Sequence, residues 1–220
     1  MAGMTRIEMK PGPWRITDPN WPTFTPYDTK GIVLSDTFTG DGPLLGRATD
    51  SGLGGAPATW SGAGTATDWS TVGGVLRIRP GGVVVAGIPH TLTTFSLEVA
   101  VAGLPAAGGG NLWIEPWKAG TPTAAGGAAL RMEITPAGAV TAVWRDNARA
   151  ETRAAQSGTI RAGDRITARV TPTELSILVG GAVVSSVPHS QPLTTSHFAG
   201  MTKVAATDAS LTSWVVRDGA

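Results

Sequence analysis

The clearest capacity for chemistry in this 220-residue chain lies in one segment, NLWIEPW, which begins at Asn111. In an extended strand, successive side chains point to opposite faces, so a period of two places Trp113, Glu115 and Trp117 on one face. If the two aliphatic residues between them face the core, two indole rings and a carboxylate share an exposed surface. Such a surface can stack on a sugar ring and accept hydrogen bonds from its hydroxyl groups.

A second segment, 129–135, adds polar groups to the same surface. Its Arg131 and Glu133 alternate with apolar residues, which is the pattern of a strand with one solvated face. The alternative is that both tryptophans lie in the core, as large aromatic residues usually do, or that the patch is covered by the N-terminal residues 1–31 or by a partner. The residues predicted to bind carbohydrate are Trp113, Glu115, Trp117, Arg131 and Glu133.

Catalytic groups are harder to find. Retaining glycoside hydrolysis needs two carboxylates roughly 5 to 5.5 Å apart, and the glutamates of this chain lie one per segment. Only cross-strand pairing brings two together, and Glu115 with Glu133 is the one pair that we consider; surface salt bridges are the alternative. The three histidines, His90, His189 and His197, lie in predicted loops without a nucleophile elbow or a zinc-binding helix motif. We therefore predict no catalytic residue and no enzymatic activity.

Composition limits the partners. The formal net charge of +1 and the dispersed arginines give no basis for binding nucleic acid. No run approaches the roughly 20 apolar residues of a membrane helix, and the N-terminus lacks the apolar stretch of a secretory signal. We therefore expect that the protein is made in a cytoplasm and does not insert into a membrane. Without cysteine, the fold depends on burial of its core.

The segment 160–187 shows the clearest pattern of strands and turns. Ile166, Ala168 and Val170 alternate with polar residues, and Gly180-Gly181 supplies the positive φ of a two-residue hairpin turn. The segment 148–156 has helical propensity, but the turn at 146–147 favours a returning strand. Further strands are predicted at 32–38, 69–78 (a hairpin), 83–86, 95–101, 111–115, 129–135, 140–145 and 211–217.

Residues 1–31 differ from the rest of the chain. Five prolines favour extended backbone and are interleaved with large aromatic side chains that gain stability by burial. We predict an N-terminal arm that docks on its own domain or on a neighbouring subunit, and a single domain over 32–220. The predicted docking residues of the arm are Trp14, Trp21, Phe24 and Tyr27.

Several segments in this order resemble the concanavalin A-like lectin or laminin-G-like family. They are the opening strand 33–38, the motif Leu45-Gly46-Arg47 leading to Trp60, the hairpin 72–76, the strand 95–101, and the turns 162–165 and 179–181. The resemblance implies an all-β fold, an antiparallel jelly-roll β-sandwich whose last strand pairs beside the first. The variant with this opening looks like domains in minor tail proteins of actinobacterial tailed phages.

The function that this resemblance implies is that of a non-enzymatic virion structural and adhesion protein, a minor tail or tail-fibre protein assembled in the bacterial host cytoplasm. Its partners would be other virion proteins, sister subunits in a homo-oligomer, a trimer by analogy with tail fibres, and host cell-wall glycan. Alternatives are a carbohydrate-binding receptor module, a capsid-decoration protein and a polysaccharide-degrading glycosidase. The hydrolases of this family use Glu-x-Asp-x-x-Glu on one strand, which this chain lacks.

The resemblance also raises a metal site. Pairing of the first and last strands would bring Asp36 near Asp218, and carboxylate oxygens are the ligands that calcium prefers. The alternative is that the aspartates accept hydrogen bonds in turns. Calcium is the one cofactor that the sequence leaves open, and its candidate ligands are Asp36, Asp41, Asp50 and Asp218.

Overall fold

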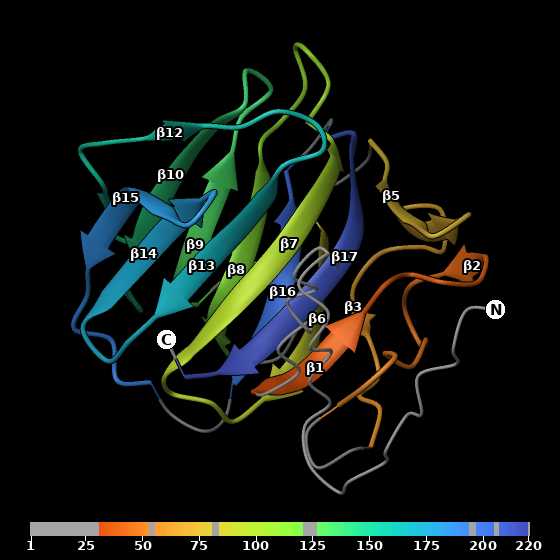
Figure 1. The fold of residues 1–220 in the computed structure, drawn as a ribbon, viewed down its shortest axis with the longest axis horizontal. Coiled ribbons are helices and arrows are strands. Elements are labelled where there is room, and N and C mark those ends of the chain that lie inside the picture. Colours follow the sequence, from red (N-terminus) through yellow and green to blue (C-terminus); the bar gives the residue numbers. More distant parts are fainter. Residues whose placement is uncertain are drawn as a thin grey trace, which may run out of the picture.

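The computed structural model describes residues 31–52, 56–80, 84–120, 127–193, 197–204 and 207–219. Within these ranges every regular element is a β-strand, so the expected all-β class is confirmed. No helix among the described residues is long and apolar enough to cross a membrane. Figure 1 shows that the strands form two layers packed face to face.

Sheet 1 is antiparallel and has nine strands. Its strand order is β15 (Ala182–Pro188), β14 (Glu174–Val179), β13 (Arg165–Val170), β7 (Phe95–Gly103), β17 (Ala209–Asp218), β5 (Val75–Ile78), β4 (Trp69–Val72) and β2 (Gly42–Pro43), with β1 (Ile32–Asp36) also beside β17. The pairing of the first strand with the last confirms the expected jelly-roll closure.

Sheet 2 has eight strands, also antiparallel. Its strand order is β11 (Glu151–Arg153), β10 (Ala139–Arg145), β9 (Ala129–Ile134), β8 (Leu112–Ala119), β16 (His197–Lys203), β6 (Val84–His90) and β3 (Ser61–Gly62), with β12 (Gly158–Thr159) also beside β10. The short β11 confirms that the segment after the turn at 146–147 returns as a strand against β10.

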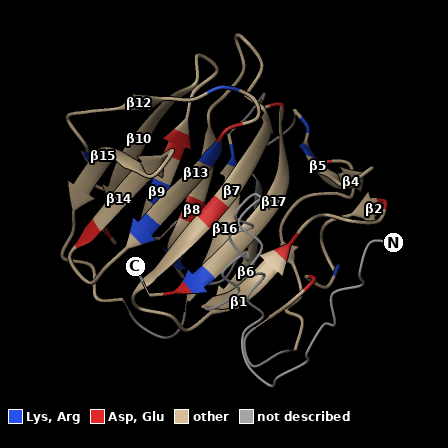
Figure 2. Cartoon of the chain, viewed as in Figure 1, with Lys and Arg blue, Asp and Glu red and all other residues tan. Residues whose placement is uncertain are grey.

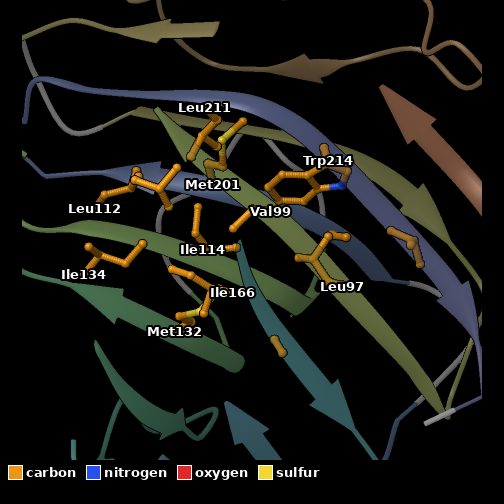
Figure 3. Packing of buried hydrophobic residues seen from close by; sticks show 14 of the residues in the cluster. Leu97, Val99, Leu112, Ile114, Met132, Ile134, Ile166, Met201, Leu211 and Trp214 are labelled. Atoms are coloured by element: carbon orange, nitrogen blue, oxygen red, sulfur yellow. The ribbon is translucent and has the colours of Figure 1, made fainter. Parts of the chain in front are cut away.

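The core lies between the two sheets. In Figure 3, Leu97, Val99 and Trp214 of sheet 1 meet Ile114 and Met132 of sheet 2, and all five side chains are fully buried. These residues occupy every second position of their strands, so the opposite side chains of each strand face away from the core. The outward side chains of sheet 2 are therefore free of a packing role in this core.

One central strand, β16, was not predicted. Its sequence HFAGMTK is rich in small and polar residues, and a glycine in its middle weakens any strand signal. The structure explains that glycine: a Cβ at Gly200 would lie 2.4 Å from the carbonyl oxygen of Ala86. β16 and β6 thus approach too closely at this point for any side chain at position 200.

Candidate binding face

The segment that predicted sugar binding lies on β8, in the middle of sheet 2. Leu112 and Ile114 are buried in the core, and Trp113 between them faces the other way and is partly exposed. Beyond Ile114 the pairing shifts: three steps along β8, from Glu115 to Lys118, oppose only two steps along β16. The shift is a β-bulge, and it reverses the alternation of side chains.

The bulge corrects one expectation. Trp117 does not share a face with Trp113; it is fully buried in the core cluster, with its ring centroid 5.7 Å from that of His197. Lys118 takes the outward position instead. Pro116 lies inside the bulge, where its missing N–H leaves no ladder bond unmade. Counting by twos through a bulge assigns every later residue to the wrong face, and this caused the error.

The outward side of sheet 2 collects charged and polar side chains from five strands, which we call the polar network. Of the five residues predicted to bind sugar, it brings together four. Its members are Trp113, Glu115 and Lys118 of β8, Arg131 and Glu133 of β9, Arg145 of β10, Glu151 and Arg153 of β11, and Thr202 of β16.

One half of the polar network centres on Glu115. The Nζ of Lys118 lies 3.0 Å from Oε1 and 3.1 Å from Oε2 of this carboxylate, and Thr202 donates to Oε2 at 2.6 Å. Both charged side chains are fully buried. Burial lowers the pKa of Lys118 from its ordinary value, while the adjacent carboxylate opposes the shift. Glu115 thus has three hydrogen bonds from its own chain.

The other half centres on Arg131, whose guanidinium carbon lies 4.0 Å from the ring centroid of Trp113. This is a cation–π contact. The Nη2 of Arg131 donates to Glu151 on the edge strand β11, and Arg153 bonds both Glu151 and Glu133. The edge strand therefore ties two carboxylates and two guanidinium groups into one chain of ion pairs.

Glu133, the second carboxylate of this half, accepts two hydrogen bonds. Asn111 donates to its Oε1 at 2.6 Å, and Arg153 donates to its Oε2. Although burial raises the pKa of Glu133, the hydrogen bonds from Arg153 and Asn111 outweigh that effect and lower the pKa below its ordinary value. Glu133 is therefore a stable carboxylate, not a proton donor at neutral pH.

Some donors of the polar network have no acceptor. In the part of the chain that the structure describes, the Nε and Nη1 of Arg131 are buried and make no hydrogen bond, and the same holds for the Nε1 of Trp113. Arg131 is fully buried. Buried N–H groups without a partner carry a free-energy cost, so this corner of the network is short of acceptors.

Lys118, Arg145, Glu151, Arg153 and Thr202 were not predicted as site residues. Counting by twos places Lys118 on the inner face of β8, and only the bulge brings it to the outer face. Thr202 lies on β16, which was not predicted. Only the alternating Glu-Thr-Arg of residues 151–153 carried a signal, because it places two opposite charges on one face of a predicted strand.

The four predicted calcium ligands are not brought together as one set. The antiparallel register sets Asp36 opposite Trp214, whereas Asp218 lies at the other end of the pairing, where its backbone N–H bonds the carbonyl of Gly31 at 2.7 Å. The expectation that Asp36 lies near Asp218 is therefore wrong, because an antiparallel partner places the end of one strand beside the start of the other. Among the described residues no group of three or more carboxylates and histidines could hold a metal ion.

The remaining two aspartates line an open surface pocket of about 480 Å³ in the loop between β1 and β4. Asp41 accepts a bond from the backbone of Gly73, and Asp50 accepts two from Thr37. The guanidinium of Arg47 lines the same pocket. These aspartates act as hydrogen-bond acceptors in turns, which was the alternative reading of the sequence.

The predicted docking residues of the arm, Trp14, Trp21, Phe24 and Tyr27, lie outside the described residues. In the view of Figure 2, Lys and Arg are interspersed with Asp and Glu over the described strands.

Two antiparallel sheets packed face to face, with the first strand paired to the last, form a jelly-roll β-sandwich. Solved structures share this fold. LamAcat from Zobellia galactanivorans is 12% identical, with 86% of this chain and 98% of that chain covered and a TM-score of 0.58. The endo-β-1,3-glucanase from Pyrococcus furiosus is 10% identical, with 85% of this chain and 94% of that chain covered and a TM-score of 0.59.

A third similar structure is the carbohydrate-binding module CBM66 from Bacillus subtilis, at 13% identity, with 70% of this chain and 94% of that chain covered and a TM-score of 0.53. At these identities the likeness establishes the fold alone. No protein-family model matches the chain, and no curated protein does.

Proposed function

We propose that the chain is a non-enzymatic carbohydrate-binding module that recognises its glycan through the polar network of sheet 2. The observation that carries the proposal is the burial of Glu115, Lys118 and Arg131 on a sheet face that is not part of the core. Buried ion pairs contribute little to stability compared with apolar residues of the same volume. Recognition of a polar ligand is the role that such a costly arrangement fits best.

The polar network offers the chemistry that a sugar needs. Carboxylates accept from hydroxyl groups, guanidinium and ammonium groups donate to them, and an aromatic edge contacts the apolar face of a ring. Trp113 remains partly exposed although Arg131 stacks on its ring. Domains of the same fold whose names include carbohydrate binding or recognition support this reading, among them CBM66 and the Emp47p carbohydrate recognition domain, the latter with a TM-score of 0.54.

The geometry of β8 supports binding without hydrolysis. Its outward residues Trp113, Glu115 and Lys118 have the spacing of Glu-x-Asp-x-x-Glu, the strand motif of the hydrolases that the sequence resembles, and only the middle one is a carboxylate. Glu115 is tied to Lys118 and Thr202, and Glu133 to Arg153 and Asn111. Neither carboxylate is placed as a free nucleophile or acid.

The proposal is tested by affinity electrophoresis against a panel of soluble glycans. Trp113→Ala is expected to weaken retardation by about tenfold, which corresponds to about 1.4 kcal/mol. Val183→Ala, which alters an exposed residue of sheet 1, is the matched control and should change nothing. If the Trp113 variant is retarded as strongly as the wild type, the glycan does not bind on the outer face of sheet 2. Release of reducing ends by the wild type, lost in Glu115→Gln or Glu133→Gln, would instead identify a glycosidase.

We further propose that the module serves host attachment in a phage tail, as the resemblance of the sequence implies. The backbone N–H of Asp218 bonds the carbonyl of Gly31, so the point where residues 1–30 join the domain lies beside the end of β17. Residues 1–30 would then anchor a trimer. Light scattering is expected to give a trimer mass for the full chain and a monomer mass for a chain that begins at Gly31. Equal masses would overturn the anchoring role.

A further inference from the structure

The polar network is short of acceptors at one place. The Nε and Nη1 of Arg131 and the Nε1 of Trp113 are buried donors without a partner in the described part of the chain. The two side chains touch, because the guanidinium stacks on the indole. Unfilled donors on two adjacent side chains favour a ligand group that accepts several hydrogen bonds.

The charges point the same way. Among the charged members of the polar network, the cations are Lys118, Arg131, Arg145 and Arg153, and the carboxylates are Glu115, Glu133 and Glu151. Four cations thus face three carboxylates, and most of these side chains are buried. A buried cation is stable only when an anion and further hydrogen bonds compensate its loss of water. These described side chains therefore carry a net charge of +1, which favours an anionic ligand over a cationic one.

We infer that the glycan bound at this face is acidic, and that the oxygens of its carboxylate or sulfate group accept hydrogen bonds from Arg131 and from the Nε1 of Trp113. This inference rests on the proposed function and adds the class of ligand. Guanidinium groups pair with such anions more strongly than with neutral hydroxyls. The apolar edge of Trp113 favours a sugar ring as the carrier of the charge.

Glu151 is the internal competitor of this anion. It occupies the Nη2 of Arg131 from the edge strand β11, and its side chain is 31% exposed, whereas Arg131 is fully buried beneath it. Trp113, on whose ring the guanidinium stacks, is partly exposed, and Arg153, which also bonds Glu151, is exposed. An acidic ligand therefore reaches Arg131 by displacing side chains and leaves the strands in place.

The experiment measures affinity for two matched pairs of polymers by isothermal titration. Polygalacturonate and its fully methyl-esterified form differ in carboxylate charge, and carrageenan and agarose differ in sulfate. The acidic member of at least one pair is expected to bind about tenfold more tightly, and the pair that shows the difference distinguishes carboxylate from sulfate. Arg131→Gln should abolish the difference. Arg165→Gln removes the same charge from the opposite sheet, where Arg165 pairs with Glu98, and should leave it intact.

A second variant separates ligand recognition from a structural role. Glu151→Gln frees Arg131 from its competitor and is expected to tighten binding of the acidic polymer several-fold. A purely structural ion pair cannot produce this gain, so the variant decides the matter even if Arg131→Gln fails to fold. Equal affinity for the charged and neutral polymers, or no gain in Glu151→Gln, would overturn the inference and leave the proposed function standing. Binding of none of the four polymers, nor of any glycan in the earlier panel, would overturn the proposed function itself.

A third outcome concerns non-specific attraction. Single-stranded oligonucleotide is titrated as an anionic polymer without sugar-acid groups of this kind. Affinity equal to that for the acidic polysaccharide would show that charge alone is recognised and would overturn the inference. A preference for the polysaccharide that survives 200 mM salt supports it, since non-specific ionic attraction is strongly screened by salt.

Discussion

Trp60 and Asp36 are joined in the core by a hydrogen bond of 2.7 Å, donated by the indole Nε1 to Oδ2 of the carboxylate. The backbone N–H of Phe38 and the guanidinium of Arg47 fill the other oxygen. Burial raises the pKa of Asp36, although these donors lower it. The loop that follows β1 is therefore fixed to the core by one buried carboxylate, and Trp60 contributes a hydrogen bond as well as packing.

Trp60→Phe is expected to lower the free energy of unfolding by about 1 to 3 kcal/mol more than Trp214→Phe. The two tryptophans are both fully buried and in contact, but the Nε1 of Trp214 has no hydrogen-bond partner among the described residues. The control thus removes the same ring atoms without a bond. Urea unfolding monitored by fluorescence gives both values. Equal losses would show that the bond to Asp36 contributes nothing.

The prediction of loop histidines is wrong for two of the three: His90 and His197 lie in strands β6 and β16, whereas His189 follows β15 outside any strand. His90 ends β6 with its side chain buried, and its Nε2 donates to the carbonyl of Pro116 inside the bulge of β8 at 3.1 Å. Its Nδ1 therefore accepts, and His197 supplies the donor at 3.2 Å. Burial and, to a smaller extent, the neighbouring His197 together lower the pKa of His90 to about 3.

This depressed pKa makes stability depend on pH. An unfolded histidine titrates near 6.5, so between pH 6.5 and about 3 the unfolded chain holds a proton that folded His90 does not. The free energy of unfolding is then fully retained above pH 6.5 and falls as the pH is lowered, by up to roughly 1.4 kcal/mol per pH unit from this residue. Urea titrations at pH 7 and pH 4.5 measure the slope. His90→Gln should flatten it; a slope identical to that of the wild type would assign the dependence to other groups.

Glycine at position 200 is required by the close approach of two strands. A Cβ there would lie 2.4 Å from a backbone oxygen of β6, which cannot move without shifting the strand. At Gly103 the nearest obstacle is the hydroxyl of Ser210 at 2.7 Å, and that side chain can rotate. Gly200→Ala is therefore expected to lower the melting temperature by several degrees more than Gly103→Ala. Differential scanning fluorimetry compares them, and similar shifts would refute the close approach.

The fold was predictable where alternation is regular. Ile166, Ala168 and Val170 are buried as expected, and the hairpin between β4 and β5 turns at Gly73 and Gly74, both with positive φ. β16 was missed because its pairing depends on a glycine and small side chains, and their value becomes visible only beside β6. Local alternation therefore identified the strands that show a regular pattern. It missed β16, whose small residues can be understood only from its contact with β6.

The candidate site was predictable to the same extent. The face shared by Glu115, Arg131 and Glu133 follows from the period of two, and the structure has it. Lys118 and Trp117 exchanged faces because a bulge adds one residue to the count. The presence of Pro116 was the only local sign of this irregularity, since proline is confined to edges and bulges of sheets. The ion pairs with β11 depend on sheet order, which no local pattern encodes.

The two tryptophans of β8 provide the sharpest test of that bulge. Trp117 is fully buried in the core, whereas Trp113 is partly exposed on the outer face. Trp117→Ala is expected to cost about 3 to 5 kcal/mol of unfolding free energy, the usual loss for a large aromatic residue in a core. Trp113→Ala should cost far less, about 1 kcal/mol, because it loses the contact with Arg131 and limited burial. Guanidinium chloride unfolding of both variants checks the difference. Comparable losses would mean that both rings lie in the core and that the alternation does not reverse at Pro116.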